Sequence, residues 1–432
     1  MKNVLIITYY WPPMGGGGVQ RWLKTSKYLK NNSDWNPIIF TVKNAEISIH
    51  DNNLEEEVKD LTVLRSSIWE PFKLYKFITG RRNEAINPGF LKTSDKKSFL
   101  DNFSMWIRSN FFIPDAKCFW ITPAYKQLKK ILKKYKIDVI VSTGPPHTTH
   151  LIAMKVKKEY KIPWLADFRD PWTNIDFYQK LNLSFIADRM HRYYELNVLK
   201  NADIVTTVSK SWADDFYKIY NREIIVINNG FDPEDFAIKS PKVLDANFSI
   251  THAGSMNGDR NHDVFWKTLK DMCDSLPDFR EKLEVKLIGP IDFSVRKSIS
   301  KYNLNENVTI IDQLTHNKVI NQLISSQLLY LPLNNSLNIR GIVPGKTYEY
   351  IAAKRPIICI GDTNGDTAKI LKETNSGYIF SFLDSNSLKE KLLYFYSMFK
   401  NDEIQVFSKN ISIYSRKELS MKFVDIFNKM NS

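Results

Sequence analysis

The sequence has few cysteines: Cys118, Cys273 and Cys359 are the only three in 432 residues, and they lie far apart. No CxxC pair occurs, so the spacing typical of a structural zinc site or of a disulfide framework is missing. Long apolar runs are missing as well, because no stretch approaches the roughly 18–20 apolar residues that span a bilayer. The apolar start at 4–7 runs into Trp11, two prolines and four glycines, which makes it too short and too broken for a signal peptide. We therefore expect a soluble cytoplasmic protein with reduced thiols.

Acidic side chains are too few to balance the basic ones. The chain has 61 Lys and Arg and 47 Asp and Glu, which gives a net charge of +14. This excess favours an acidic partner, such as a phosphorylated small molecule, a nucleic acid or an anionic membrane surface. Hydrophobic residues make up 43% of the chain, which is enough to form folded cores and argues against disorder. The length predicts two to three domains at roughly 100–200 residues each.

Short apolar runs alternate with helical patterns along most of the chain. Runs of about four to eight apolar residues without strict alternation are typical of strands buried on both faces. Helical periods between such runs indicate βαβ units, and therefore parallel sheets covered by helices. Two series of six runs predict an α/β protein with two doubly wound, Rossmann-like domains. The runs are 4–9, 38–42, 137–142, 164–167, 204–208 and 224–227, then 248–253, 283–288, 308–311, 328–331, 357–360 and 378–382.

A cluster of turn residues, Asn229, Gly230 and Pro233 among them, follows the last run of the first series and indicates the joint between the domains. We therefore predict a first domain over 1–232 and a second over 233–410. Within the first, residues 71–120 are rich in Phe, Trp, Lys and Arg but lack a strand pattern, and we interpret them as a helical or loop insertion. Apolar residues at helical spacing predict a C-terminal helix in 411–432.

Four consecutive glycines at 15–18 follow the first predicted strand and precede a helical pattern. Glycines allow the backbone to approach an anion closely, and the start of the next helix adds a partial positive charge. The spacing is not GxGxxG, and no acidic residue lies at the ribose-binding offset, which disfavours dinucleotide binding. The pattern predicts an anion-binding loop, and a flexible turn is the alternative.

Two polar clusters follow later strands of the first series, at the end where ligands bind in open α/β sheets. His147 and His150 follow the third run; a histidine there can bond a sugar hydroxyl or a phosphate, or it can be purely structural. His147 lies nearer the strand end and is our candidate. Asp167 ends the fourth run, and Arg169 and Asp170 follow it. This group either orients a hydroxylated acceptor or forms a buried ion-pair network that braces the loop.

The first strand of the second series ends in small residues. Gly254 and Ser255 leave room for a ligand, and Arg260 offers a fork of donors suited to a diphosphate. An ordinary surface loop is the alternative.

The most informative motif is a glycine-bearing loop that enters a helix, at 341–356. Backbone N–H groups and Lys346 lie at the positive start of this helix, where they can neutralise a phosphate. Glu349, one turn along, can accept hydrogen bonds from vicinal ribose hydroxyls. A simple i,i+3 surface pair of Lys346 and Glu349 is the alternative.

This loop and helix resemble the donor-binding signature of the family-4 glycosyltransferases, which have the GT-B fold of two facing Rossmann-like domains. The resemblance covers nearly the whole chain, because the segments 15–18, 202–209, 229–232 and 253–255 also fit that family in order. It implies a retaining hexosyl- or N-acetylhexosaminyl-transferase in bacterial-type envelope polysaccharide synthesis. The donor is then a UDP- or GDP-linked sugar, and the acceptor is a saccharide or a lipid-linked saccharide.

The resemblance also assigns roles to residues. It implies that Glu349 binds the donor ribose, that Lys346 and Arg260 neutralise the diphosphate, and that His147 lies near the transferred sugar. The terminal helix packs back on the first domain in this fold. Further residues are implied around the two substrates: Gly254, Ser255, Val343, Pro344 and Gly345 on the donor, Gly16 and Gly17 on its phosphate and sugar, and Asp167, Arg169 and Asp170 on the acceptor or sugar side.

The sequence departs from the family at Gly341, where many members carry the first of two glutamates. That glutamate contacts sugar hydroxyls, and backbone N–H groups at 343–345 are the available replacement. The chain also lacks a convincing DxD pair, so we expect no metal and no cofactor beyond the nucleotide-sugar itself. A catalytically idle sugar-nucleotide-binding protein and a sugar-nucleotide epimerase of GT-B type remain as alternatives. Nucleic-acid binding ranks last, because zinc-finger, aromatic–basic and recognition-helix patterns are missing.

One predicted helix has lysines around an apolar stripe, Leu128, Ile131 and Leu132, within 126–136. It is either an ordinary helix with a solvated basic face or, with the insertion at 71–120, a contact to an anionic inner membrane leaflet. The second alternative predicts a cytoplasmic protein attached peripherally to the inner membrane.

Overall fold

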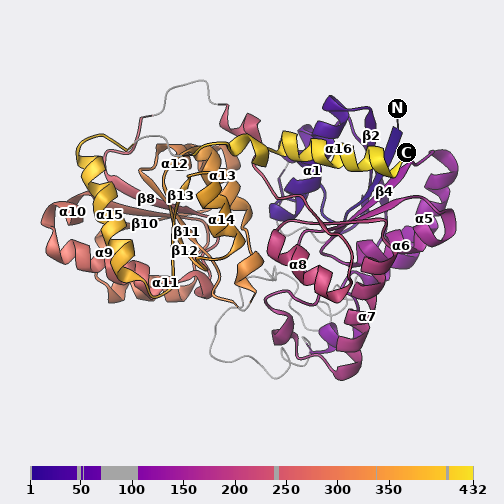
Figure 1. The fold of residues 1–432 in the computed structure, drawn as a ribbon, viewed down its shortest axis with the longest axis horizontal. Helices are drawn as coiled ribbons and strands as arrows, with labels where there is room; N and C mark the ends of the chain where they lie inside the picture. Colours follow the sequence, from indigo (N-terminus) through magenta and orange to yellow (C-terminus); the bar gives the residue numbers. More distant parts are fainter. Residues whose placement is uncertain are drawn as a thin grey trace. The chain divides into compact units, whose positions relative to one another are not determined.

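The computed structural model describes residues 2–45, 50–51, 53–69, 106–237, 243–336, 338–404 and 408–431. The chain divides into two compact units, Met1–Asn228 with Arg416–Ser432, and Asn229–Ser415 (Figure 1). Among the described helices, none has the length and the hydropathy that a bilayer span requires.

The first unit is a parallel sheet of seven strands in the order β3-β2-β1-β4-β5-β6-β7. Its central strands are apolar runs with β-branched residues, and the side chains of Val4, Leu5, Ile6 and Ile7 are all fully buried, as expected for a sheet covered on both faces. The strands are β1 (Lys2–Ile7), β2 (Trp35–Val42), β3 (Thr62–Ser66), β4 (Val139–Gly144), β5 (Trp164–Phe168), β6 (Ile204–Thr207) and β7 (Ile225–Val226).

Helices connect these strands and cover the sheet (Figure 1). They are α1 (Gly17–Asn32), α2 (Asn53–Glu56), η1 (Cys118–Trp120), α5 (Ile121–Lys134), α6 (Thr148–Tyr160), η2 (Tyr178–Leu181), α7 (Phe185–Asn201) and α8 (Lys210–Ile219).

The C-terminal helix α16 (Arg416–Met430) packs on α1 and is part of the first unit. The ring of Phe423 lies 4.8 Å from that of Trp22, and the ring of Phe427 lies 5.3 Å from that of Trp35. Trp35 Nε1 also donates to Asn428 Oδ1 at 3.0 Å. The apolar spacing of the terminal segment thus corresponds to a helix face buried in the core of the first unit.

The second unit is a parallel sheet of six strands in the order β10-β9-β8-β11-β12-β13. The strands are β8 (Phe248–Ala253), β9 (Leu283–Ile288), β10 (Val308–Ile311), β11 (Leu328–Pro332), β12 (Ile357–Ile360) and β13 (Gly377–Phe380). Its helices are η3 (Pro233–Phe236), η4 (Gly258–Arg260), α9 (Asp263–Ser275), α10 (Pro277–Lys282), α11 (Phe293–Lys301), η5 (Asn305–Asn307), α12 (His316–Ser325), η6 (Ile339–Gly341), α13 (Gly345–Ala353), α14 (Asp366–Glu373), α15 (Ser385–Lys400) and η7 (Ile411–Tyr414).

These two doubly wound parallel sheets confirm the predicted fold class. Each of the twelve predicted runs overlaps an observed strand. The thirteenth strand, β3, was not predicted, because it lies at the sheet edge, is largely half-buried and has Arg65 within its apolar run.

The boundaries of the units lie near the predicted ones. The first unit ends at Asn228, where 232 was proposed, and resumes at Arg416, where 411 was proposed. Of the proposed insertion at 71–120, residues 71–105 lie outside the described residues; 106–111 form a helix, and turns lead from it to η1.

Candidate active site

Lys346 lies in the first turn of α13, and its side chain extends to the end of β8. Its Nζ lies 2.7 Å from the position that a Cβ atom on Gly254 would occupy, and Gly254 has a φ of +107°. Glycine adopts this backbone conformation without strain, and a Cβ atom here would displace the ammonium group from its position. The structure thus brings together two residues that lie far apart in the sequence.

The loop before α13 presents its backbone. Pro344 has a φ of −58° and precedes the first helical residue, Gly345. Thr347 N–H donates to the Pro344 carbonyl at 2.9 Å and closes the first turn. No side chain in the described part of the chain caps this helix start, so its N–H groups and dipole are available to an anion. The side chain of Val343 is buried in the core of the second unit.

His252, near the end of β8, is fully buried and contacts Lys346. Its Nδ1 lies 3.0 Å from the Tyr330 carbonyl oxygen, and its Nε2 lies 3.4 Å from Lys346 Nζ. Because a carbonyl oxygen only accepts, Nδ1 carries the proton and Nε2 accepts from the ammonium. Burial, with the charge of Lys346, holds the pKa of His252 well below its usual range, so the ring is neutral at pH 7.

His252 was not predicted from the sequence as a site residue. The signal that was available is a histidine inside an apolar strand, two residues before Gly254.

Arg260 is held beside the same loop by two hydrogen bonds. Its Nε donates to Asn334 Oδ1 at 2.7 Å, and its Nη1 donates to the Ser255 carbonyl at 2.9 Å. These bonds join the loop after β8 to the loop after β11 and orient the guanidinium. Ser255, predicted to border the donor, contributes its carbonyl to this arrangement.

Two cations therefore lie close together at this end of the second sheet. Burial lowers the pKa of Lys346 to about 7, helped by the charge of Arg260 and opposed by Glu349. Burial and a second cation both disfavour the charged form of a lysine side chain. An anion that binds beside the lysine therefore stabilises this charged form strongly. The arrangement indicates an anion site formed by Lys346, Arg260 and the start of α13.

Glu349 is partly buried and lies one turn along α13 from Lys346. Its charge raises the pKa of Lys346 and of Tyr350, which places the carboxylate near both. The Tyr350 hydroxyl accepts from the Ala253 N–H at 2.8 Å and fastens α13 to β8. Glu349 and Lys346 thus belong to one cluster with Gly254 and Arg260.

In the first unit, the glycine loop forms the start of α1. Gly16, with a φ of 93°, precedes the first helical residue, and a Cβ atom on Gly17 would meet nothing within 4 Å. Arg169 fastens the loop, because its Nη1 donates to the Gly18 carbonyl at 2.7 Å. The space beside Gly17 is consistent with the predicted approach of an anion to this backbone.

Arg169 also contacts the loop after β4 and the carboxylate of the adjacent Asp170. Its Nη2 lies 3.3 Å from the Pro145 carbonyl oxygen, and its Nε lies 3.5 Å from Asp170 Oδ2. Burial raises the pKa of Asp170, while the charge of Arg169 opposes this. The guanidinium therefore connects the glycine loop, the loop after β4 and the loop after β5.

Asp167 is completely buried, and both of its carboxylate oxygens are occupied. Arg21 donates to them through Nε (3.0 Å) and Nη2 (2.8 Å). Burial alone would raise the pKa of Asp167, but Arg21 and the other donors hold it below its usual range. The remaining donors are Trp22 Nε1 (2.8 Å), Thr143 Oγ1 (3.0 Å) and Thr206 Oγ1 (2.8 Å).

Of the two alternatives predicted for this carboxylate, the structure shows the buried ion-pair network for Asp167. No oxygen of this fully buried carboxylate is left to orient an acceptor.

His147 is buried at the start of α6, with its ring stacked on Trp172 at 4.5 Å. Its Nδ1 has no hydrogen-bond partner among the described residues. Burial, with the charge of neighbouring histidines, lowers its pKa well below the usual range. A Cβ atom on Gly144 would lie 2.9 Å from this Nδ1 and 2.6 Å from His150 Nε2. Glycine is therefore required where the strand β4 passes the two rings.

The ring of His150 is oriented by a hydrogen bond to its Nδ1. Trp164 Nε1 donates to Ser142 Oγ at 2.8 Å, so the Ser142 hydroxyl donates onward to His150 Nδ1 at 2.8 Å. The proton of this neutral ring is then on Nε2, next to Gly144. The Nε2 of His150 has no hydrogen-bond partner among the described residues, and His150 is fully buried, whereas His147 is 7% exposed. His147 is therefore the better placed of the two for a ligand.

The chain is similar to known proteins in family and in fold. Residues 96–235 match the family model for Glycosyltransferase Family 4. The chain has no match among curated proteins. The family match confirms the resemblance to family-4 glycosyltransferases that the motifs indicate.

Solved structures match over the full length. Sucrose-phosphate synthase from Thermosynechococcus elongatus has a TM-score of 0.65 at 12% identity, with 100% of this chain and 99% of that chain covered. HepE from Anabaena in complex with UDP-glucose has a TM-score of 0.59 at 11% identity, with 99% of this chain and 100% of that chain covered. S. aureus TarM in complex with fondaparinux, alpha-GlcNAc-glycerol and UDP has a TM-score of 0.59 at 14% identity, also covering 99% and 100%. These likenesses confirm the GT-B fold.

Proposed function

We propose that this protein is a retaining glycosyltransferase that moves a sugar from a nucleotide-diphospho-sugar to a saccharide or lipid-linked saccharide acceptor. The proposed setting is envelope polysaccharide synthesis of the bacterial type. The observation that supports the donor class is the cluster of Lys346, Arg260 and the uncapped start of α13 beside Gly254. Structures of the same fold hold UDP-glucose or UDP, which supports a nucleoside diphosphate as the leaving group.

The hard step is the break of the bond between the anomeric carbon and the diphosphate oxygen. Negative charge develops on that oxygen, so fixed cations and N–H groups placed there stabilise the transition state. Lys346, Arg260 and the backbone at Gly345 would serve this role, and Glu349 would accept hydrogen bonds from the ribose. We expect no divalent metal in this arrangement.

Retention follows if the acceptor hydroxyl attacks from the side on which the diphosphate leaves. The new bond joins the acceptor oxygen to the anomeric carbon, the bond to the diphosphate breaks, and the departing phosphate takes the hydroxyl proton. No protein nucleophile is required. The ring of His147 would contact the transferred sugar, and the backbone at Gly16 and Gly17 would approach the donor phosphate.

The test is a donor panel followed by transfer and hydrolysis assays on matched variants. UDP- and GDP-linked sugars are screened by thermal shift, because a specific ligand raises the apparent stability. We expect Lys346→Ala and Glu349→Ala to lose transfer while their melting temperatures stay near that of the wild type. Lys318→Ala, an exposed lysine on α12 of the same unit, is the matched control and should keep full activity. Full activity of the Lys346 variant would remove the main support for this site.

A catalytically idle sugar-nucleotide-binding protein is the second candidate, because Gly341 stands where the family's first glutamate would contact the sugar. Such a protein binds the donor saturably without turnover. Measured hydrolysis or transfer of any donor on the panel would exclude it.

A further inference from the structure

Helix α7 has several large apolar side chains on its outer face. Phe185, Ile186 and Tyr193 are 78%, 71% and 61% exposed, and Met190 and Leu196 are also exposed. At 100° per residue these positions share one side of the helix. A helix of a water-exposed domain normally places such residues toward the core and its polar residues toward water.

The inward face of the same helix carries polar groups. His191 and Glu195 are buried, with His191 Nδ1 accepting from Trp172 Nε1 at 3.1 Å and Glu195 Oε2 accepting from Thr173 Oγ1. Ala187, Val198 and Leu199 complete that face. The inward face of α7 is therefore mixed, with apolar and polar residues, and the domain core does not explain the large apolar side chains on the outward face.

The outward face of α7, formed by residues 185, 186, 189, 190, 193, 196, 197 and 200, has one sign of charge. Arg189 and Lys200 are exposed on it, and no acidic residue occurs among these eight positions. Asp188, at the edge, is occupied by Tyr178 Oη (2.9 Å) and by Arg192 Nε (2.8 Å). The face is thus apolar and basic together.

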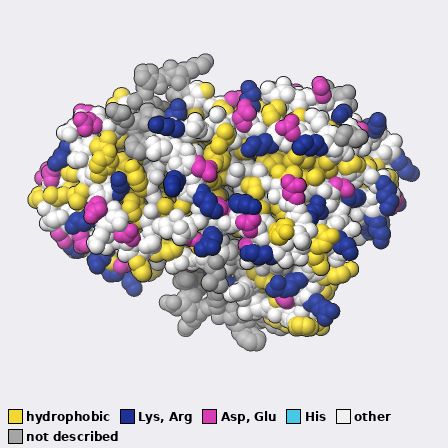
Figure 2. All heavy atoms as spheres, viewed as in Figure 1, with side chains coloured by type: hydrophobic (Ala, Val, Ile, Leu, Met, Phe, Trp, Pro, Cys, Tyr) yellow, Lys and Arg dark blue, Asp and Glu magenta, His cyan; other side chains and the backbone are white. Residues whose placement is uncertain are grey.

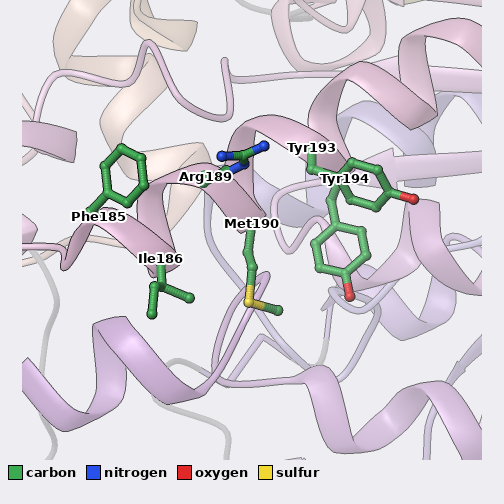
Figure 3. Close-up of a pocket in the computed structure, with 6 residues that line it drawn as sticks. All are labelled: Phe185, Ile186, Arg189, Met190, Tyr193 and Tyr194. Atoms are coloured by element: carbon green, nitrogen blue, oxygen red, sulfur yellow. The ribbon is translucent and has the colours of Figure 1, made fainter.

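Figure 3 shows Phe185, Ile186 and Met190 projecting from this one helix, with Arg189 and the tyrosines beside them. These side chains line a shallow hollow rather than an enclosed cavity. In the space-filling view, hydrophobic side chains lie among Lys and Arg over the region of α7 (Figure 2).

Helix α5, the basic helix that the sequence offered for membrane contact, differs from α7. Ala124, Leu128 and Ile131 are buried in the core, and Lys129 pairs with Glu159 at 3.0 Å. Its apolar stripe is used inside the domain, which agrees with the ordinary alternative. α5 can offer charge to a surface but no apolar side chain to insert.

We propose that the outward face of α7 docks on an anionic lipid bilayer, with Phe185, Ile186, Met190 and Tyr193 in the interface and Arg189 on the headgroups. Exposed apolar side chains next to Arg189 and Lys200, with no acidic residue among them, match the chemistry of that surface and not of water or of a basic protein. Tyrosine suits the boundary, because its ring is apolar and its hydroxyl stays hydrated. This proposal does not depend on the proposed transfer reaction.

The test is co-sedimentation of the full chain with vesicles, which needs no donor and no activity. Vesicles of phosphatidylglycerol with phosphatidylcholine are compared with phosphatidylcholine alone. We expect binding to the anionic vesicles at low salt and weaker binding at about 0.5 M salt, where the Debye length falls below about 5 Å. Absence of binding to anionic vesicles at low salt would overturn the proposal.

A matched pair of triple variants identifies the face. Phe185→Ser, Ile186→Ser and Tyr193→Ser together should lower the partition coefficient at least about tenfold, since each removes exposed apolar area from the interface. Val243→Ser, Phe293→Ser and Leu383→Ser remove comparably exposed apolar side chains from the second unit and should leave binding unchanged. Equal binding of the two triple variants would refute the assignment to α7.

Two further measurements distinguish membrane contact through α7 from membrane contact through α5 and from self-association of the chain. Lys130→Gln, Lys133→Gln and Lys134→Gln on α5 should weaken binding less than the α7 variant does. If they abolish binding while the α7 variant binds normally, the contact belongs to α5 and the proposal is wrong. A dimer in light scattering that becomes a monomer in the α7 variant would show a contact between copies of the chain and would also overturn it.

Discussion

The pKa of Lys346, about 7, predicts that donor affinity depends on pH in a defined direction. Below pH 7 the free protein already carries the ammonium, so binding a diphosphate costs no proton. Above pH 7 the free lysine is neutral, and binding must take up a proton to restore the cation, because the diphosphate raises the lysine pKa. The donor affinity should therefore be independent of pH below pH 7 and should fall as the pH rises above 7.

The size of the effect follows from linkage. If the bound pKa lies above about 9, the affinity falls by almost tenfold for each pH unit above 7. Between pH 6 and pH 8.5 this amounts to roughly 30-fold, or about 2 kcal/mol. Proton uptake on binding should be near zero at pH 6 and about one at pH 8.5.

Isothermal titration calorimetry measures both quantities, with a nucleotide-sugar whose diphosphate does not titrate in this range. Repeating each titration in buffers of different ionisation enthalpy gives the number of protons taken up. Lys346→Arg keeps its charge throughout, so its affinity should be level from pH 6 to 8.5. Level affinity without proton uptake in the wild type would refute the reasoning, because Lys346 would then already be charged in the free protein.

Three further predictions concern single side chains. Gly254→Ala should lose donor binding, because the new Cβ atom would lie 2.7 Å from Lys346 Nζ and at a φ of +107°; a calorimetric affinity within twofold of the wild type would contradict it. Asp167→Asn should lower the free energy of unfolding in urea by about 3–5 kcal/mol, because it leaves the buried Arg21 guanidinium uncompensated; a loss below about 1 kcal/mol would contradict the bracing role. His147→Gln should lower kcat about 10²-fold with little change in donor affinity, and a change in KM alone would place His147 outside the reacting region.

The helices and strands could be predicted because their signals are local. A strand covered on both faces reads as an apolar run wherever it occurs, as in β1 and β8, and the helix start at Gly345 follows from the loop that precedes it. Lys346 and Glu349 could be singled out for the same reason, since one turn of helix places them near each other. The strand β3 was missed because an edge strand needs no continuous apolar run.

Polar groups could be placed only by long-range contacts. The sequence left two roles open for Asp167, acceptor binding and a buried ion pair. Its partner Arg21 lies 146 residues away, so no local pattern shows that the carboxylate is paired inside the domain. His252 reads as one more strand residue until Lys346, 94 residues later, reaches its Nε2.

The sequence by itself determined two series of buried parallel strands and the glycine-lined ends where ligands bind, because burial period and backbone freedom are properties of neighbouring residues. Only the tertiary structure decided which charged side chains form internal ion pairs and hydrogen bonds, and which face of α7 is turned outward. Both depend on which distant segments pack together, and the free energy of a buried charge or of an exposed apolar side chain is set by those partners.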